Sequence, residues 1–192
     1  MPNISRINGL RPVSTISGAP WNGQIEVFSV LASDATALGV GDVVISAGTA
    51  DADGVQAVTR MTANTQSPLG VIVGFLPDYS NLAIPSQFRA ASTARRVYVV
   101  TDPHVVYEVQ ANASTALADI GLNTGLAYTA VSTTTGFSQM QADMATRATT
   151  ATLPLKIVGV VQRVDADMAD PANWKLRVTL NTNNFAGATV GV

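Results

Sequence analysis

Short runs of apolar residues alternate with turn-forming residues along most of this chain, a pattern that is typical of β-strands. Residues 24–31 have the composition of a strand, and residues 41–45 form a short apolar strand after a glycine turn. Residues 55–61 can pair with that second strand across the polar turn Asp51-Ala52-Asp53-Gly54. This part of the chain therefore predicts a strand followed by a β-hairpin.

Three later segments extend the same pattern. Leu69–Phe75 is a continuous apolar run bounded by prolines, as expected for a strand buried on both faces, and residues 155–164 form a similar run. Residues 174–180 alternate between apolar and polar positions, and the predicted inward-facing set is Trp174, Leu176, Val178 and Leu180. Strands without a βαβ rhythm predict an all-β fold, either a compact β-barrel or a sandwich.

A second hairpin is predicted in the middle of the chain. Residues 96–101 and 105–110 have strand composition, and Asp102-Pro103-His104 lies between them. Pro103 fits a turn because proline has no N–H to donate to a sheet. We expect these two strands to pair with each other.

One short helix is predicted at about residues 139–147. Residues 111–136 are rich in turn signals, and an S-x-x-Q sequence that begins at Ser138 then has the spacing of a helix capping box. Met140 and Met144 are four residues apart and would share one face of that helix. We interpret this pair as packing residues.

The chain divides into three regions by composition. Residues 1–24 predict an extended N-terminal arm, residues 25–182 a β-rich core domain and residues 183–192 a C-terminal tail. The arm has no sustained period but carries apolar side chains that favour packing against a surface, namely Ile4, Ile7, Leu10, Val13, Ile16 and Trp21. That surface belongs either to the same domain or to a neighbouring subunit.

No strict internal repeat is visible, although two segments resemble each other. Residues 68–74 (PLGVIVG) and 154–159 (PLKIVG) each place an apolar run after Pro-Leu. They could be equivalent strands of a barrel, or they could match by chance.

The composition excludes several kinds of site. The chain has no Cys and one His, so disulfides, thiolate metal sites and His-based metal sites are excluded. It has 11 basic and 13 acidic residues and no basic cluster longer than Arg95-Arg96, which argues against nucleic-acid binding. No segment approaches the roughly 18 apolar residues of a membrane span, and we see no secretory signal at the N-terminus.

The low charge itself indicates a function in contact with other proteins. Only 12% of residues are charged, against roughly 25% in an average soluble domain. A surface with few charges is easier to desolvate against a neighbour, and interface cores are depleted in charge for that reason.

Candidate catalytic groups are few. His104 could act as a general base oriented by Asp102, but no nucleophile motif accompanies it, so we interpret it as a turn residue. Gly136-Phe137-Ser138-Gln139-Met140 lacks the second glycine of a nucleophile elbow. Asp51 and Asp53 lack the remaining ligands of a calcium loop, and we interpret them as a polar hairpin turn. We therefore expect no enzyme activity and no cofactor.

A series of short motifs occurs in order over residues 8–180. They are Gly9-Leu10-Arg11-Pro12-Val13, Gly18-Ala19-Pro20-Trp21-Asn22-Gly23, Gly41-Asp42-Val43-Val44, Pro68-Leu69-Gly70-Val71, Asp102-Pro103, Tyr107-Glu108-Val109-Gln110, Ile120-Gly121-Leu122-Asn123, Thr135-Gly136-Phe137-Ser138 and Pro154-Leu155-Lys156-Ile157. In these motifs and their order the chain resembles the head cement (decoration) proteins of tailed bacteriophages. The resemblance implies a structural virion protein on the outer surface of the capsid, which clamps neighbouring major capsid proteins against internal DNA pressure.

The resemblance also implies partners. They are the major capsid protein and further copies of this chain, for which we favour a homotrimer and keep a dimer as the alternative. No nucleic acid or membrane partner is expected. The arm could add to a neighbour's sheet edge, and we expect its interface anchors to be Ile7, Leu10, Arg11, Val13 and Trp21.

Three alternatives remain open from the sequence. A phage tail or baseplate protein would also be all-β, but repeats or a coiled-coil stem would be expected. A hydrolase would depend on His104 and Asp102. A carbohydrate-binding decoration module would need aromatic platforms, and the chain has only two Trp, four Tyr and five Phe.

Overall fold

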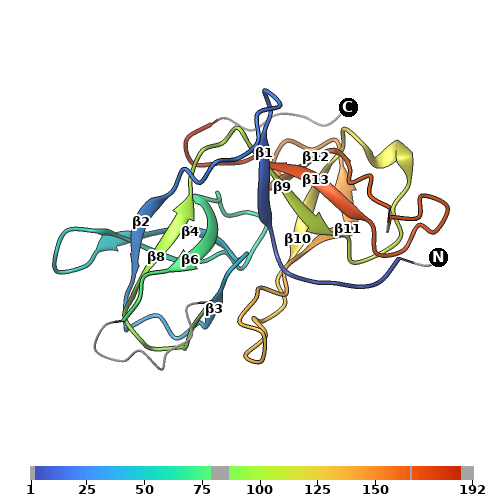
Figure 1. The fold of residues 1–192 in the computed structure, drawn as a ribbon. Helices are drawn as coiled ribbons and strands as arrows, with labels where there is room; N and C mark the ends of the chain where they lie inside the picture. Colours follow the sequence, from blue (N-terminus) through green and yellow to red (C-terminus); the bar gives the residue numbers. More distant parts are fainter. Residues whose placement is uncertain (1–2, 79–86, 165, 187–192) are drawn as a thin grey trace.

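The computed structural model describes residues 3–78, 87–164 and 166–186, and this part of the chain is nearly all β (Figure 1). The strands are β1 (Arg11–Thr15), β2 (Glu26–Val30), β3 (Leu38–Gly39), β4 (Val43–Ala50), β5 (Gln56–Arg60), β6 (Gly70–Phe75), β7 (Phe88–Arg89), β8 (Arg95–Val100), β9 (Val105–Gln110), β10 (Asn123–Ala127), β11 (Gln141–Ala148), β12 (Leu155–Val160) and β13 (Lys175–Leu180). A 3₁₀ turn, η1, spans Leu117–Asp119. The predicted all-β fold is confirmed.

The first half of the chain forms a closed barrel in the order β2-β5-β4-β6-β8. β4 and β5 pair antiparallel across the turn at Asp51–Gly54, as the sequence predicts. β6 lies between β4 and β8, and its continuous apolar run reflects burial on both faces, because Val71 packs in one core cluster and Ile72 in the other. The parallel pair Ser29–Ala57 joins β2 to β5 and closes the barrel.

The second half forms a six-stranded sheet in the order β1-β9-β13-β12-β10-β11. The predicted alternation of β13 is confirmed, because Trp174, Leu176, Val178 and Leu180 are all buried. The sheet curls so that β11, its last strand, comes back to β9, where Ala111 after β9 forms a parallel bridge with Ala142. β3 and β7 form a separate two-stranded sheet.

The two halves have the same topology. The first barrel, followed from β5, is ordered β5-β4-β6-β8-β2, and the second sheet, followed from β11, is ordered β11-β10-β12-β13-β9. When the five strands of each barrel are numbered along the chain, both orders are third, second, fourth, fifth and first. In both halves the first strand lies parallel to the third and closes the barrel. The second half is therefore a second barrel, to which β1 is added.

The pairing registers repeat as well. A register shift between Ile72 and Gly74 of β6 has its counterpart between Ile157 and Gly159 of β12. The turn before the second strand has Gly41 at φ +93° and Gly121 at φ +95°. Their amides donate to Ile72 O at 2.8 Å and to Ile157 O at 2.9 Å. The resemblance between residues 68–74 and 154–159 therefore marks equivalent strands of two barrels.

One apolar core joins the two barrels. Its largest cluster combines Val43, Met61 and Val71 of the first barrel with Tyr107 and Leu176 of the second. Tyr107 is fully buried, and its hydroxyl donates to Val100 O at 3.4 Å. The region that the sequence predicts as one core domain, residues 25–182, thus contains two barrels that share a core.

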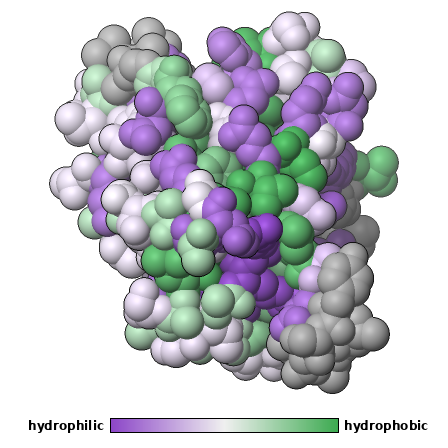
Figure 2. Space-filling view, turned by 90° about the vertical axis from the view of Figure 1, so that its left-hand side faces the viewer, coloured by the Kyte–Doolittle hydropathy of each residue, from purple (hydrophilic) through white to green (hydrophobic). Residues whose placement is uncertain are grey.

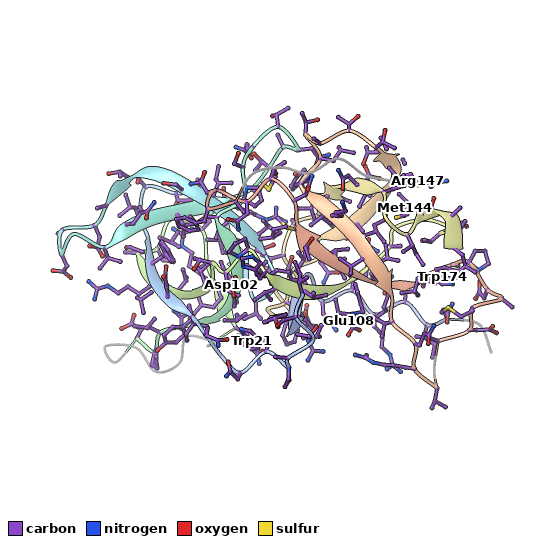
Figure 3. The ribbon with its side chains drawn as sticks, turned by 90° about the horizontal axis from the view of Figure 1, so that it is seen from above. Trp21, Asp102, Glu108, Met144, Arg147 and Trp174 are labelled. Carbon is purple, nitrogen blue, oxygen red and sulfur yellow. The ribbon has the colours of Figure 1, made fainter. Side chains whose placement is uncertain are left out.

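The predicted hairpin over residues 96–110 is wrong. β8 belongs to the first barrel and β9 to the second, so the turn at Asp102–His104 passes from one barrel to the other (Figure 3). All six residues of β9 are buried, and Val105, Tyr107 and Val109 pack in the core that the two barrels share. Two adjacent apolar strands with a turn between them have the same pattern whether they pair or separate.

The predicted helix at 139–147 is also wrong, because residues 141–147 of this segment belong to β11. Met140 and Met144 are fully buried, since residues four apart also share one face of a strand. The hydroxyl of Ser138 donates to the buried Asp42 carboxylate and does not cap a helix. The loop-rich segment 111–136 contains η1 and one strand that the sequence analysis missed, β10.

The two chain ends each fasten to the barrel built by the opposite half. β1 precedes the first barrel but pairs with β9 of the second. After β13, the amide of Asn184 donates to Pro68 O at 2.9 Å, next to β6 of the first barrel. Residues 187–192 of the predicted tail lie outside the described residues.

Candidate interface around the N-terminal segment

The segment before β1 is held on the second barrel by polar contacts of Asn3. Its side-chain amide donates to the backbone oxygens of Asp167, Asp170 and Ala172 at 2.9–3.0 Å. Its Oδ1 accepts from the Asp167 amide at 2.7 Å. The Asn3 side chain therefore holds the N-terminal segment against the loop between β12 and β13.

The next anchor is a close approach between two glycine turns. Gly9 has φ +65°, and a Cβ built on it would lie 2.5 Å from Gly41 O, so only glycine fits. The adjoining Leu10 donates its amide to Gly41 O at 3.0 Å and is 1% exposed. This contact places Leu10 in the shared core.

β1 then pairs antiparallel with β9, with Arg11 opposite Glu108. The chain turns at residues 15–19, and the amide of Trp21 donates back to Val13 O at 3.2 Å. Trp21 packs partly buried against the shared core, and its Nε1–H has no hydrogen-bond acceptor among the described residues. The predicted arm thus packs against its own chain, and residues 11–15 of it form an edge strand of the second barrel.

The five predicted interface residues differ in accessibility. Arg11 and Val13 are exposed, Ile7 and Trp21 are partly exposed, and Leu10 is buried in the core of this chain. The N-terminal segment brings all five into one continuous stretch. Only the first four present surface to a partner in this conformation.

A pocket of about 670 Å³ opens between this segment and the second barrel. Four basic and two acidic side chains line it, namely Arg6, Arg11, Arg163, Lys175, Glu108 and Asp167. Arg163 pairs with the largely buried Glu108 at 2.5 Å. Of these basic residues only Arg11 is a predicted site residue, because Arg163 and Lys175 are more than 150 positions from it along the chain.

The basic side chains of the pocket lie close enough together to repel one another. Burial lowers the pKa of Lys175, and the nearby Arg163, Arg11 and Arg6 lower it further, while Glu108 opposes them. The Lys175 ammonium also donates to Arg6 O at 2.7 Å. A carboxylate entering the pocket would relieve the repulsion among these cations.

Exposed apolar side chains are concentrated in the same part of the sequence. Ten large apolar residues are exposed in the described chain, and half of them lie within residues 4–27. These five are Ile4, Val13, Ile16, Ile25 and Val27. Figure 2 looks onto the side of the molecule where the first barrel lies, and separate apolar areas are visible there among polar residues.

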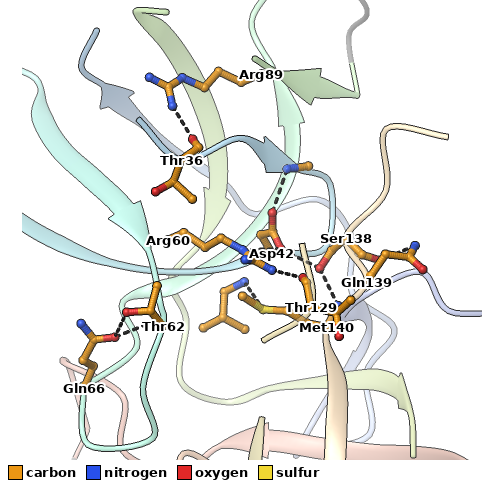
Figure 4. A network of polar contacts seen from close by, with 12 residues as sticks. Thr36, Asp42, Arg60, Thr62, Gln66, Arg89, Thr129, Ser138, Gln139 and Met140 are labelled. Carbon is orange, nitrogen blue, oxygen red and sulfur yellow. Dashed lines mark hydrogen bonds and ion pairs between the residues drawn. The ribbon is translucent and has the colours of Figure 1, made fainter. Parts of the chain in front are cut away.

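A buried polar network joins the two barrels beside this segment (Figure 4). Asp42, which is fully buried, accepts from the Ser138 hydroxyl at 2.7 Å and the Gly39 amide at 2.8 Å. Arg60, 7% exposed, approaches the same carboxylate at 3.3 Å and donates to Thr129 O. The network thus links the first barrel to the segment between β10 and β11 of the second.

Burial raises the pKa of Asp42 above its ordinary value of 3.8, while Arg60, Ser138 and the Gly39 amide lower it. The direction shows that desolvation outweighs the hydrogen bonds. Every partner of this carboxylate is part of the protein framework. We therefore assign the network a structural role in joining the barrels.

The remaining candidate catalytic and calcium-binding residues lie in turns. His104 is 74% exposed at its side chain, and Asp102 accepts from the His104 amide at 2.8 Å and faces its ring at 3.2 Å. Asp51 accepts from two amides of its own turn, and Arg96 contacts both Asp51 and Asp53. The interpretation of Asp51–Gly54 as a polar hairpin turn is confirmed.

Comparisons with family models, curated proteins and solved structures return no match. Within residues 3–78, 87–164 and 166–186, no three His, Cys, Asp or Glu side chains are grouped as a metal site would require. The same residues contain no helix long and apolar enough to cross a membrane.

Proposed function

We propose that this chain is a capsid cement protein that binds the outer surface of a phage head and clamps neighbouring major capsid proteins. The observation that carries the proposal is the concentration of exposed apolar side chains within residues 4–27. Exposed apolar side chains that gather on one part of a protein surface often mark a site where another protein binds. The low charge of the whole chain supports the same conclusion.

The basic pocket supports a specific contact within this interface. Four basic side chains against two acidic ones leave an excess of positive charge beside the exposed apolar segment. An acidic side chain of the capsid protein would complement that charge and orient the bound chain. Many copies on one shell would convert modest single contacts into strong retention.

The test is whether purified protein adds to undecorated heads of the parent phage and raises their rupture temperature. We expect saturable binding and a higher rupture temperature. Absence of binding would refute the proposal. Light scattering on the free protein tests the expected homotrimer against a dimer.

Point variants are better suited than deletion of the arm, because Leu10 and β1 belong to the fold. Ile4→Ser and Ile16→Ser change exposed side chains, 68% and 60% accessible, and should weaken head binding. Leu117→Ser, at a side chain 65% exposed on η1, is the matched control. Equal binding by all three variants would exclude the N-terminal segment as the interface.

A further inference from the structure

The internal repeat reveals a difference at one strand edge. In the second barrel, β1 lies along the edge of β9 at Val105–Glu108. The pairing registers make Glu26 of β2 the counterpart of Tyr107, because they face the equivalent residues Val99 and Val178. The counterparts of Val105–Glu108 are therefore residues 24–27. Among the described strands, β2 pairs with β8 along its length and with β5 at Ser29 alone.

The backbone groups that face this open edge follow from the second barrel. There the amide of Ile16 donates to His104 O, and the amide of Asn112 donates to Ala142 O. Alternate residues of an antiparallel strand point to the same side, so Val106 and Glu108 also face β1. Their counterparts on β2 are Ile25 and Val27, each with one N–H and one C=O directed outward.

The side chains at the open edge are apolar and accessible. Ile25 is 42% exposed and Val27 is 43% exposed, whereas their counterparts Val106 and Glu108 are 1% and 8% exposed. Tyr98 lies opposite Val27 on β8 and extends this surface. An uncovered edge with apolar side chains is a template for another strand.

We propose that the open β2 edge, residues 24–27, receives an extended strand of the capsid protein, in the register that β1 adopts on β9. This inference rests on the proposed function. The added strand would run antiparallel to β2, place apolar side chains against Ile25 and Val27, and carry a basic side chain near Glu26. In the second barrel β1 carries a basic residue next to this position, because Pro12 lies opposite Tyr107, the counterpart of Glu26, and Arg11 lies opposite Glu108.

Charge decides between the capsid protein and a second copy of this chain. Glu26 is exposed and forms no ion pair with any described residue. Two copies paired edge to edge around Glu26 would place like charges opposite each other, which is unfavourable. A strand with Lys or Arg at that position would be attracted, so the observations favour a different protein as the occupant.

The experiment compares Val27→Pro with Val27→Thr in binding to undecorated heads. Proline removes the outward N–H of residue 27 and is tolerated on edge strands, whereas threonine keeps both the N–H and the branched shape. We expect Val27→Thr to bind like the unmodified chain and Val27→Pro to bind at least ~10-fold more weakly, with unchanged thermal unfolding. Equal binding by both variants would overturn the inference and leave the proposed function intact.

Hydrogen exchange on the unmodified chain provides a readout that does not depend on the proline variant folding. Amides of Ile25 and Val27 should exchange more slowly once the protein is bound to heads, and unchanged exchange would overturn the inference. A second copy as occupant would instead appear as a dimer that Val27→Pro dissociates, which would overturn the assignment of the partner. Failure of the unmodified chain to bind heads would remove the proposed function and this inference together.

Discussion

Replacing Arg60 by Met tests whether the buried network joins the two barrels. The substitution leaves the Asp42 carboxylate fully buried without its cation and removes the hydrogen bond to Thr129 O. Breaking a buried ion pair by removing one partner costs about 3–5 kcal/mol. For a chain of this size, that loss corresponds to a decrease in melting temperature of about 6–20 °C.

The pH dependence gives a second measure of the same effect. Burial raises the pKa of Asp42 above 3.8, so the folded protein keeps this proton at pH values where the unfolded chain has lost it. The contribution of Asp42 to stability is therefore greatest at low pH and decreases as pH rises through the folded pKa. Because Arg60 lowers that pKa, its removal should steepen the dependence. The deficit of Arg60→Met should be smaller at pH 4.5 than at pH 7.

The assay is denaturant unfolding at both pH values, followed by circular dichroism. Arg96→Met is the matched control, because Arg96 pairs with Asp51 and Asp53 at a partly exposed site and should cost at most about 1 kcal/mol. Combining Arg60→Met with Asp42→Asn should recover part of the loss, since the double variant leaves no charged side chain in this network. A loss below about 1 kcal/mol that is equal at both pH values would refute the reasoning.

Three further predictions concern separate parts of the fold. Gly41→Ala should destabilise more than Gly54→Ala in thermal unfolding: both have positive φ, but a Cβ on Gly41 meets Asn8 O at 2.5 Å while one on Gly54 meets nothing within 4 Å. Leu10→Ala should cost about 2–5 kcal/mol in denaturant unfolding, and Val13→Ala at most about 0.5; similar losses would contradict the burial of Leu10. His104→Ala should leave both stability and head binding unchanged, and loss of binding would contradict its role as a turn residue.

The sequence predicted individual strands better than their partners. The alternation at 174–180 and the apolar run at 69–75 identify strands because each depends on local burial. The pairing of β8 and β9 could not be read in the same way, since a tight turn between apolar strands fits both a hairpin and a crossing between barrels. Met140 and Met144 show the corresponding ambiguity, because a spacing of four suits both a helix and a strand face.

The junction between the barrels was beyond sequence reasoning for a different reason. Arg60 lies 18 positions and Ser138 lies 96 positions from Asp42 along the chain, and no spacing rule connects the three residues. A buried charge also looks like a surface charge until its surroundings are known. The likeness of residues 68–74 and 154–159 was the one local signal of the repeat, and it was visible in the sequence.

The crossing of the chain ends has a mechanical consequence. The N-terminal segment pairs with the second barrel, and Asn184 is hydrogen-bonded to the first barrel. A force that separates the barrels would load both of these contacts at once, and β1 would resist because all of its backbone hydrogen bonds to β9 must break together. The two barrels should therefore bear such a force as one unit, which suits the proposed role on a capsid under internal pressure.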